Sequence, residues 1–131
     1  MNYLMDTHIF LWALFEPKKI SAKARKILHS QENSVFISAI SFWEISLKHT
    51  LGKLELQGIS PRELPDLASQ IHFDTLALSP EDGASFYQLP RIGHKDPFDR
   101  MIIWQALRND MTLISKDKEC PEYQKLGLRL V

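Results

Sequence analysis

Several short, mostly apolar runs punctuate this chain, and segments with helical periodicity separate them. The runs cover residues 3–5, 35–37, 75–78, 112–114 and 128–131. Strands that are apolar on both faces, rather than alternating with polar residues, are typical of parallel sheets covered by helices. The order of strands and helices therefore predicts an α/β fold. We expect three α/β/α layers with a short-stranded, mainly parallel central sheet.

Helix-start signals mark the segments between these runs. A Ser or Asp cap followed by proline and an acid occurs at Ser60-Pro61, Ser79-Pro80 and Asp96-Pro97, and each pair is expected to begin a helix. The last of these helices should reach about residue 107. Further helices are expected at 9–15, after Ser21, and from 40 to a stop near 52. Residues 54–60 are expected to form a loop or a short extra helix.

The amino-acid composition limits the classes of protein to which this chain can belong. A chain of 131 residues with 44% hydrophobic content is expected to form one domain, residues 1–131. The 16 basic and 16 acidic residues balance, so net charge indicates no partner. A single cysteine, Cys120, excludes an internal disulfide and fits a reducing cytoplasm. No apolar stretch approaches the ~18 residues of a membrane span, and no targeting segment is expected.

Four acidic residues are expected at one edge of the sheet. Asp6 directly follows the first apolar run, and Asp117 lies shortly after the run 112–114. Asp99 lies in the first turn of the helix that leads into that run, and Glu44 lies in the helix after the second run. Functional groups of open parallel sheets gather beyond the carboxyl ends of the strands. We therefore expect these four carboxylates to converge there.

Each acid also has a structural explanation. Asp6 and Asp96 are good helix caps, Asp99 interacts favourably with the helix dipole, and Asp117 suits a cap or a surface turn. Glu44 is the hardest to explain in this way, because it stands between large apolar neighbours. A carboxylate near a core needs a cation or hydrogen-bond donors.

Convergence of all four acids would require a countercharge. Carboxylate-rich sites suit Mg²⁺ or Mn²⁺, and the chain has no His or Cys pair at zinc spacing. A divalent ion held in this way can activate water for hydrolysis of a phosphodiester. The pattern therefore favours a metal-dependent phosphoesterase.

Four motifs, in order along the chain, resemble those of the PIN-domain ribonucleases, and in particular the VapC-type toxins of bacterial toxin–antitoxin pairs. The motifs are Asp6-Thr7-His8 with Leu11-Trp12; Ser38, Ser41, Trp43-Glu44-Ile45, Lys48, Gly52 and Leu54; His94, Asp96-Pro97-Phe98-Asp99-Arg100 and Gln105-Ala106; and Leu113-Ile114-Ser115 with Asp117.

The resemblance implies a compact α/β/α domain and a Mg²⁺- or Mn²⁺-dependent endoribonuclease. It implies a metal-binding catalytic quartet formed by Asp6, Glu44, Asp99 and Asp117. Supporting positions carried over from the family are hydroxyls near the metal at Thr7 and Ser115, a basic residue at Arg100, and an acid beside the site at Asp96.

The same resemblance implies protein partners. A cognate antitoxin that neutralises the toxin is expected, together with a homodimer or a larger toxin–antitoxin assembly. Whether Asp96 and His94 act in the site, or only in helix capping and loop structure, stays open at this point. So do the RNA target and the choice between one and two metal ions.

Because the net charge is zero, RNA binding requires basic side chains to gather on one part of the surface. Setting aside the four proposed ligands leaves 12 acidic residues against 16 basic ones. Basic residues near the motifs are Lys48, Lys53, Arg91, Lys95, Arg100, Lys116 and Lys118. Lys48 and Arg100 are favoured to face RNA, because they lie one helical turn from Glu44 and next to Asp99.

Aromatic and histidine side chains near the motifs receive a more conservative interpretation. A core or interface role is favoured over base stacking for Phe10, Trp12, Phe15 and Trp43. A capping or loop role is favoured over catalysis for His8 and His94.

Other classes of protein fit less well. A haloacid-dehalogenase-like phosphatase would need an Asp two residues after Asp6, where this chain has His8. Flap-type nucleases usually have more acids and a longer chain. A catalytically inactive PIN-like interaction module, or another carboxylate–metal phosphoesterase, remains as the alternative, although an interaction module has no need of all four acids.

Overall fold

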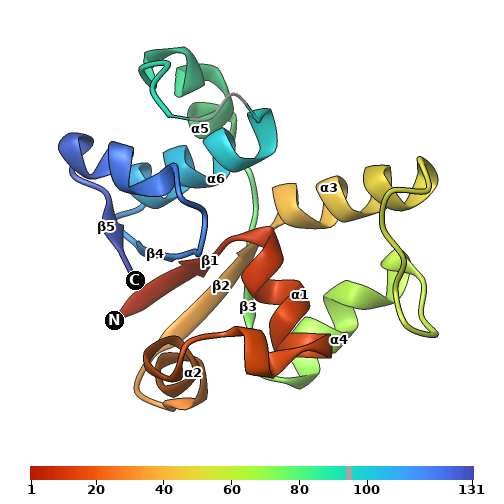
Figure 1. Cartoon of the computed structure of the whole chain (residues 1–131). Coiled ribbons are helices and arrows are strands. Elements are labelled where there is room, and N and C mark those ends of the chain that lie inside the picture. The colour runs from red at the N-terminus through yellow and green to blue at the C-terminus, as the bar shows by residue number, and fades with distance from the viewer. Residues whose placement is uncertain (94–95) are drawn as a thin grey trace.

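A parallel sheet of five strands forms the centre of the molecule (Figure 1). The computed structural model describes residues 1–93 and 96–131. The strands are arranged in the order β3-β2-β1-β4-β5, and each neighbouring pair is parallel. They are β1 (Asn2–Met5), β2 (Ser34–Ser38), β3 (Asp74–Leu76), β4 (Thr112–Ile114) and β5 (Arg129–Leu130).

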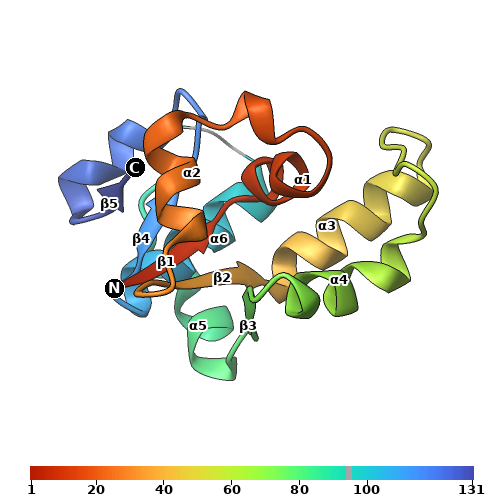
Figure 2. The same cartoon turned by 90° about the horizontal axis from the view of Figure 1, so that it is seen from below.

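Helices cover both faces of this sheet (Figure 2). They are α1 (Thr7–Phe15), α2 (Ala22–His29), α3 (Ala39–Thr50), α4 (Leu64–Gln70), α5 (Pro80–Ser85) and α6 (Pro97–Arg108). Shorter 3-10 turns lie at Pro17–Lys19, Pro61–Glu63, Phe86–Gln88 and Cys120–Leu126. The predicted α/β/α architecture with a parallel sheet is confirmed.

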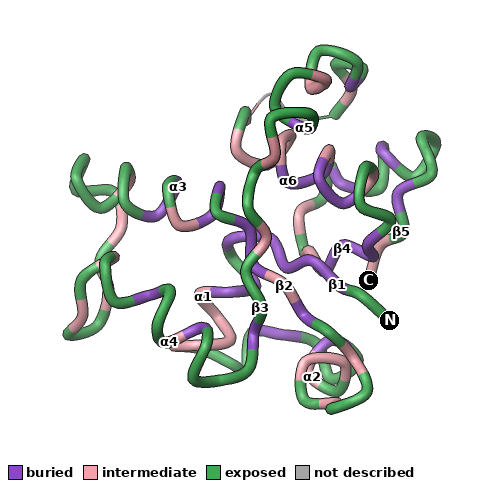
Figure 3. Tube along the Cα trace, turned by 180° about the vertical axis from the view of Figure 1, so that it is seen from behind, coloured by how far each residue is buried: buried purple, intermediate pink, exposed green. Residues whose placement is uncertain are grey.

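Two apolar cores lie on opposite faces of the sheet. Met5 packs with Phe10 of α1 and Leu64 of α4, whereas its neighbour Leu4 packs with Ile102 of α6 and Tyr123. Successive strand residues point to opposite faces, so both must be apolar when helices cover both faces. Figure 3 shows the resulting buried path along the central strands. Burial of both faces of the sheet explains why the strand sequences are continuous apolar runs.

Local caps begin most helices where the sequence predicts. The side chains of Ser21 and Ser79 accept hydrogen bonds from Ala24 N (3.1 Å) and Asp82 N (3.0 Å). The Ser60-Pro61 signal instead begins a 3-10 turn, and α4 follows from residue 64. Residues 54–60 contain no helix.

The two outer strands are shorter than the apolar runs predict. β3 covers only residues 75 and 76 of the run 75–78, and β5 covers only residues 129 and 130 of the run 128–131. β3 ends at Leu76, which pairs with Ser38, the last residue of β2, so residues 77 and 78 lie beyond its neighbour. Beyond β5, Val131 N still donates to Leu113 O at 2.9 Å.

The helices α1 and α3 start at the carboxyl end of the sheet, after β1 and β2, and α3 then extends away from the sheet (Figures 1 and 2). Within residues 1–93 and 96–131, no helix has the length and apolar character needed to span a membrane.

Candidate active site

A pocket of about 260 Å³ opens at the carboxyl edge of the two central strands β1 and β4. Asp6 follows β1 directly, Asp117 follows β4, and Asp99 reaches the same pocket from the first turn of α6. The lining residues are Asp6, His8, Trp12, Asp99, Lys116 and Asp117. The parallel pairing of β1 with β4 thus brings together acids that are more than 90 positions apart in sequence.

Asp6 both caps α1 and faces the pocket. Its Oδ1 accepts a hydrogen bond from Ile9 N at 2.8 Å, and its Oδ2 accepts one from Ser115 Oγ at 2.5 Å. Burial raises the pKa of Asp6 above its usual value, and the Ser115 and Ile9 hydrogen bonds offset only part of this effect. The capping role and the pocket-facing role are therefore compatible in one side chain.

Glu44 is held from two sides in the buried interior of the site, with 2% of its surface exposed. Its Oε1 accepts a hydrogen bond from Thr7 Oγ1 at 2.6 Å, and its Oε2 pairs with Lys48 Nζ at 2.5 Å. The Thr7 hydroxyl also lies 2.9 Å from Ser41 Oγ. These contacts explain how an acid between apolar neighbours is tolerated.

The Glu44–Lys48 pair is strong enough to change the titration of the lysine. Burial lowers the pKa of Lys48, but the hydrogen bond and negative charge of Glu44 outweigh it, and the net shift is upward. Lys48 therefore stays charged beside Glu44 at neutral pH.

Asp99 carries the clearest electrostatic signature of the site. Burial and, in decreasing order of importance, the negative charges of Asp96, Glu44, Asp6 and Asp117 together raise its pKa from 3.8 to about 7. Four like charges act on one carboxylate only when they are close to it. Asp99 is therefore the point at which the acidic side chains of the site meet electrostatically.

Asp96 begins α6 beside Asp99. Its Oδ1 accepts hydrogen bonds from Phe98 N (2.8 Å) and Asp99 N (3.2 Å), as a helix cap does. Its charge also acts on Asp99, so the capping residue contributes to the electrostatics of the site. The neighbouring His94 and Lys95 lie outside the described residues.

Ser115 connects the two acids that follow β1 and β4. Its hydroxyl donates to Asp6 and accepts a hydrogen bond from Asp117 N at 3.0 Å, while Asp117 Oδ1 accepts one from Glu119 N at 2.9 Å. Cys120 Sγ lies 3.5 Å from the same hydroxyl. Burial raises the pKa of Cys120 to about 12, so its thiol remains protonated and structural.

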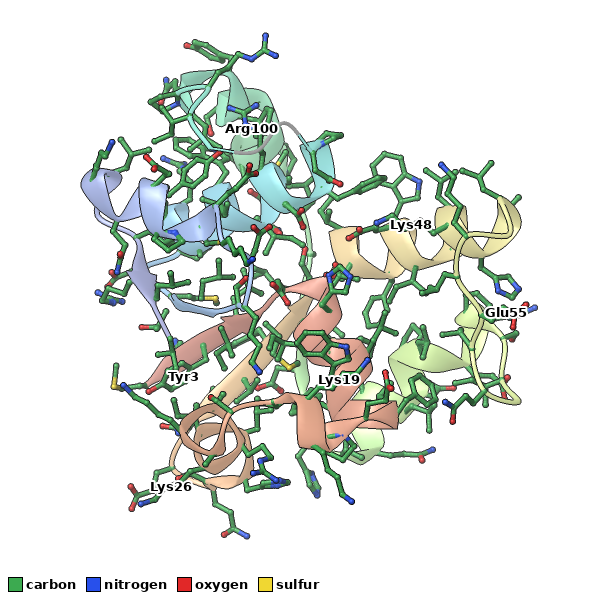
Figure 4. All side chains as sticks on the ribbon, in the orientation of Figure 1. Tyr3, Lys19, Lys26, Lys48, Glu55 and Arg100 are labelled. Carbon is green, nitrogen blue, oxygen red and sulfur yellow. The ribbon has the colours of Figure 1, made fainter. Side chains whose placement is uncertain are left out.

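The two favoured basic residues occupy different surroundings (Figure 4). Lys48 lies on α3 against Glu44, as described above. Arg100 lies on the side of α6 toward α5, where its guanidinium donates to Leu89 O (2.9 Å) and Pro90 O (3.2 Å) and lies over the Phe86 ring. Arg100 therefore holds the segment before α6, and its contact with RNA stays a prediction.

A buried polar pair that the sequence interpretation gave no role joins α3 to α6. Ser38 Oγ donates to Gln105 Oε1 at 2.5 Å and accepts from Ile40 N at 3.0 Å, and both side chains are fully buried. Gln105 Nε2 donates to Ala77 O at 3.4 Å. In the sequence, a role for Ser38 and Gln105 is indicated by their membership of the motifs that resemble the family's. It connects the helix that carries Glu44 to the helix that carries Asp99.

The donor chemistry of the pocket fits a hard divalent cation. Its convergent groups are carboxylate oxygens, and burial together with neighbouring negative charge raises the pKa of Asp99. In the described part of the chain, no three His, Cys, Asp or Glu side chains form a ready-made metal site. Oxygens of Asp6 and Glu44 are instead engaged by Ser115, Thr7 and Lys48.

Comparisons with known proteins show the family and the fold of this chain. Ribonuclease VapC22 of Mycobacterium tuberculosis is 30% identical to this chain over 116 residues, which is 88% of this chain and 86% of the relative. The crystal structure of VapBC2 from Rickettsia felis bound to a promoter DNA fragment contains a chain that matches with a TM-score of 0.69 at 16% identity, covering 100% of this chain and 98% of that one. VapBC-1 from nontypeable Haemophilus influenzae matches with a TM-score of 0.67 at 20% identity, covering 100% and 97%.

The family assignment is independent of those fold similarities. The model of the PIN domain matches residues 3–126, which include all four acids of the site. Together with the identity to a relative over most of both chains, this match shows that the protein belongs to the PIN-domain family.

Proposed function

We propose that this chain is a Mg²⁺-dependent endoribonuclease and the growth-arresting toxin of a toxin–antitoxin pair. The ribonuclease activity is supported by the 30% identity to a VapC ribonuclease over most of both chains. Divalent-metal dependence is general among PIN-domain nucleases of the VapC type, and the all-oxygen donor set favours Mg²⁺, with Mn²⁺ as the substitute.

One observation carries the proposal: burial and the charges of Asp96, Glu44, Asp6 and Asp117 raise the pKa of Asp99 to about 7 at the acid pocket. Burying a carboxylate among like charges costs free energy in folding, and a scaffold has no use for it. An enzyme gains from it, because a cation bound at this point relieves the repulsion and is held tightly.

Of the four predicted metal ligands, Asp6, Asp99 and Asp117 line the pocket and would hold the ion. Glu44, whose oxygens contact Thr7 and Lys48, would complete the negative surroundings. When bound, the ion supplies Lewis-acid activation of water and of the scissile phosphate. Ser115 orients the Asp6 carboxylate through its 2.5 Å hydrogen bond, and Thr7 does the same for Glu44 at 2.6 Å. Lys48 neutralises the second Glu44 oxygen and places a positive charge near the incoming phosphate.

We further propose a cognate antitoxin and a homodimer as protein partners. The matched solved structures are VapBC toxin–antitoxin complexes, which supports an antitoxin. On this chain, α3 exposes Trp43 (61%), Leu47 (38%) and Leu51 (58%) at helical spacing, an apolar stripe that favours a protein interface.

Cleavage of RNA by the purified protein tests the enzymatic part. Total cellular RNA is incubated with the chain in Mg²⁺, in Mn²⁺ and in EDTA, beside Asp6→Asn and Asp99→Asn. The matched control is Asp110→Asn, which changes an exposed acid paired with Arg129 away from the pocket. We expect cleavage only with metal, a loss of at least about 100-fold in both site variants, and an unchanged control. Equal cleavage in EDTA would refute the mechanism.

Induced expression tests the toxin role and separates it from an interaction module. The native chain is expected to arrest growth, whereas Asp99→Asn is expected to permit it at the same protein level. Arrest by both chains would indicate that binding to a partner, rather than catalysis, causes the effect.

A further inference from the structure

The indole of Trp12 stands in the wall between two neighbouring pockets. It lines the acid pocket and also a second pocket of about 170 Å³, which lies between α1 and residues 54–57. His8 lines both pockets as well. A polymer bound at the acids can therefore continue across His8 and Trp12 into the second pocket.

Two lysines from separate segments gather at this indole. Lys19 Nζ lies 5.8 Å and Lys116 Nζ lies 5.7 Å from the Trp12 ring centroid, within cation–π range. The Lys116 ammonium also donates to Lys19 O, and the His8 ring centroid lies 6.0 Å from that of Trp12. Figure 4 shows Lys19 beside α1. The arrangement forms a basic flank around an aromatic face.

Negatively and positively charged side chains therefore lie close together on this surface. Lys116 lines the acid pocket together with Asp6, Asp99 and Asp117, and it is also the residue that contacts Trp12. Asp6, Asp99 and Asp117 line the acid pocket, whereas the ammonium groups of Lys116 and of Lys19, which pairs with Glu16 at 3.1 Å, lie at the indole. The second pocket is also lined by the acids Glu16 and Glu55. A ligand that complements both the acid pocket and the indole carries phosphates and a flat ring.

We propose that Trp12, Lys19 and Lys116 form a nucleotide-binding subsite for single-stranded RNA, in which a base next to the cleaved phosphate stacks on the indole. This inference rests on the proposed ribonuclease function and adds to it the element that positions the substrate strand. Aromatic platforms flanked by basic side chains are the general means by which proteins hold single strands. A stacked base replaces the ammonium–indole contacts, and the released ammonium groups pair with the flanking phosphates.

The sequence pattern favoured a core or interface role for Trp12 over base stacking, and the side chain does contact the core while its remaining surface lines both pockets. Trp12 does pack partly against the core of α1, but it is only half-buried. Phe10, on the same helix, is completely buried and has no such role. The helix therefore divides its aromatic residues between core and pocket wall.

Binding of uncut RNA tests the subsite. Fluorescein-labelled single-stranded oligouridylate and oligoadenylate are titrated by anisotropy into protein that carries Asp99→Asn, which prevents cleavage. Trp12→Leu keeps apolar volume but removes the aromatic face, and Trp12→Phe keeps a smaller face. Tyr87→Leu, which changes an exposed aromatic side chain that lines neither pocket, is the matched control.

We expect Trp12→Leu to weaken binding by about tenfold, Trp12→Phe by about threefold or less, and Tyr87→Leu to leave it unchanged, since stacking is worth about 1–3 kcal/mol per base. Lys116→Met should reduce the slope of log affinity against log salt by about 0.7, the value for one phosphate contact on a single strand. Near-ultraviolet circular dichroism and the unfolding midpoint identify any variant that fails to fold.

The outcomes separate this inference from the proposed function. If the native chain cleaves RNA but Trp12→Leu and Lys116→Met bind the oligonucleotides like their parent, the subsite is refuted and the ribonuclease stands. If Trp12→Leu weakens only the association with a co-expressed antitoxin, the indole is a protein contact and the inference is also overturned. If the native chain neither binds nor cleaves RNA, the proposed function itself fails.

Discussion

Ser115 donates a 2.5 Å hydrogen bond to Asp6 across 109 positions of sequence. The bond joins the ends of β1 and β4, two neighbouring strands, and aims one Asp6 oxygen while the N-terminus of α1 holds the other. The orientation of the Asp6 carboxylate therefore depends on one contact within its own helix cap and on one contact with a residue distant in sequence.

Replacement of Ser115 tests this orientation. Ser115→Ala should weaken Mg²⁺ binding by about 10–100-fold, because Asp6 and Asp117 N both lose their shared partner. Ser115→Thr keeps the hydroxyl and should stay within about threefold of the native chain. Isothermal titration with Mg²⁺, beside cleavage rates at limiting metal, measures both. Equal affinities in Ser115→Ala and the native chain would contradict the role.

Removal of Lys48 should leave Glu44 buried beside Thr7 alone. Lys48→Met is expected to lower the free energy of unfolding by about 1–3 kcal/mol at pH 7, the usual cost of an unpaired buried polar group. Because the folded-state pKa of Lys48 is raised, the stabilisation is present below the unfolded-state pKa and is lost as pH rises through the folded-state pKa. The difference in unfolding free energy between the native chain and Lys48→Met, measured by urea unfolding, should be smaller at strongly alkaline pH than at pH 7.

The pKa of Asp99 predicts a stability that falls with pH in EDTA. The folded state holds a proton on Asp99 up to about pH 7, whereas the unfolded chain releases it near pH 3.8. The folded state therefore binds more protons in this window, and its stability decreases from pH 4 to 7.

Asp99→Asn should remove that slope and be more stable than the native chain at pH 8 by about 1–2 kcal/mol, a value discounted because the side chain is partly exposed. Urea unfolding across pH 4–8 measures it. Saturating Mg²⁺ should stabilise the native chain and not the variant. A native chain as stable at pH 8 as at pH 5 in EDTA would show that Asp99 is not under this repulsion.

The buried Ser38–Gln105 pair is expected to set the position of α3 against α6. Ser38→Ala or Gln105→Leu should each cost about 1–3 kcal/mol, because one partner is left buried without its hydrogen bond. The double variant should cost less than the sum of the two, since neither group is then orphaned. Denaturant unfolding of the four proteins tests the pair, and strict additivity would show that the two side chains act independently.

The sequence could predict what depends on neighbouring residues. Asp6 and Asp96 cap helices as their local patterns indicate, and the apolar runs form strands because both faces of the sheet are covered. The end of β3 was less predictable, because this strand ends where its neighbour β2 ends rather than where its own apolar run does.

The contacts of individual side chains in the site were beyond the sequence pattern. Arg100 follows Asp99 directly, yet its guanidinium binds the backbone of Leu89 and Pro90. Lys116 has no feature that distinguishes it from other surface lysines, yet it lies over Trp12 in the acid pocket. Both outcomes depend on which loops the fold places beside the helix.

The sequence by itself determined the strands, the helix caps and the residues that bear negative charge, because periodicity and capping act over a few residues. Only the tertiary structure decided that Thr7 and Lys48 share Glu44 and that Ser115 reaches Asp6. Those contacts follow from the strand order β3-β2-β1-β4-β5, which long-range packing selects and local pattern does not encode.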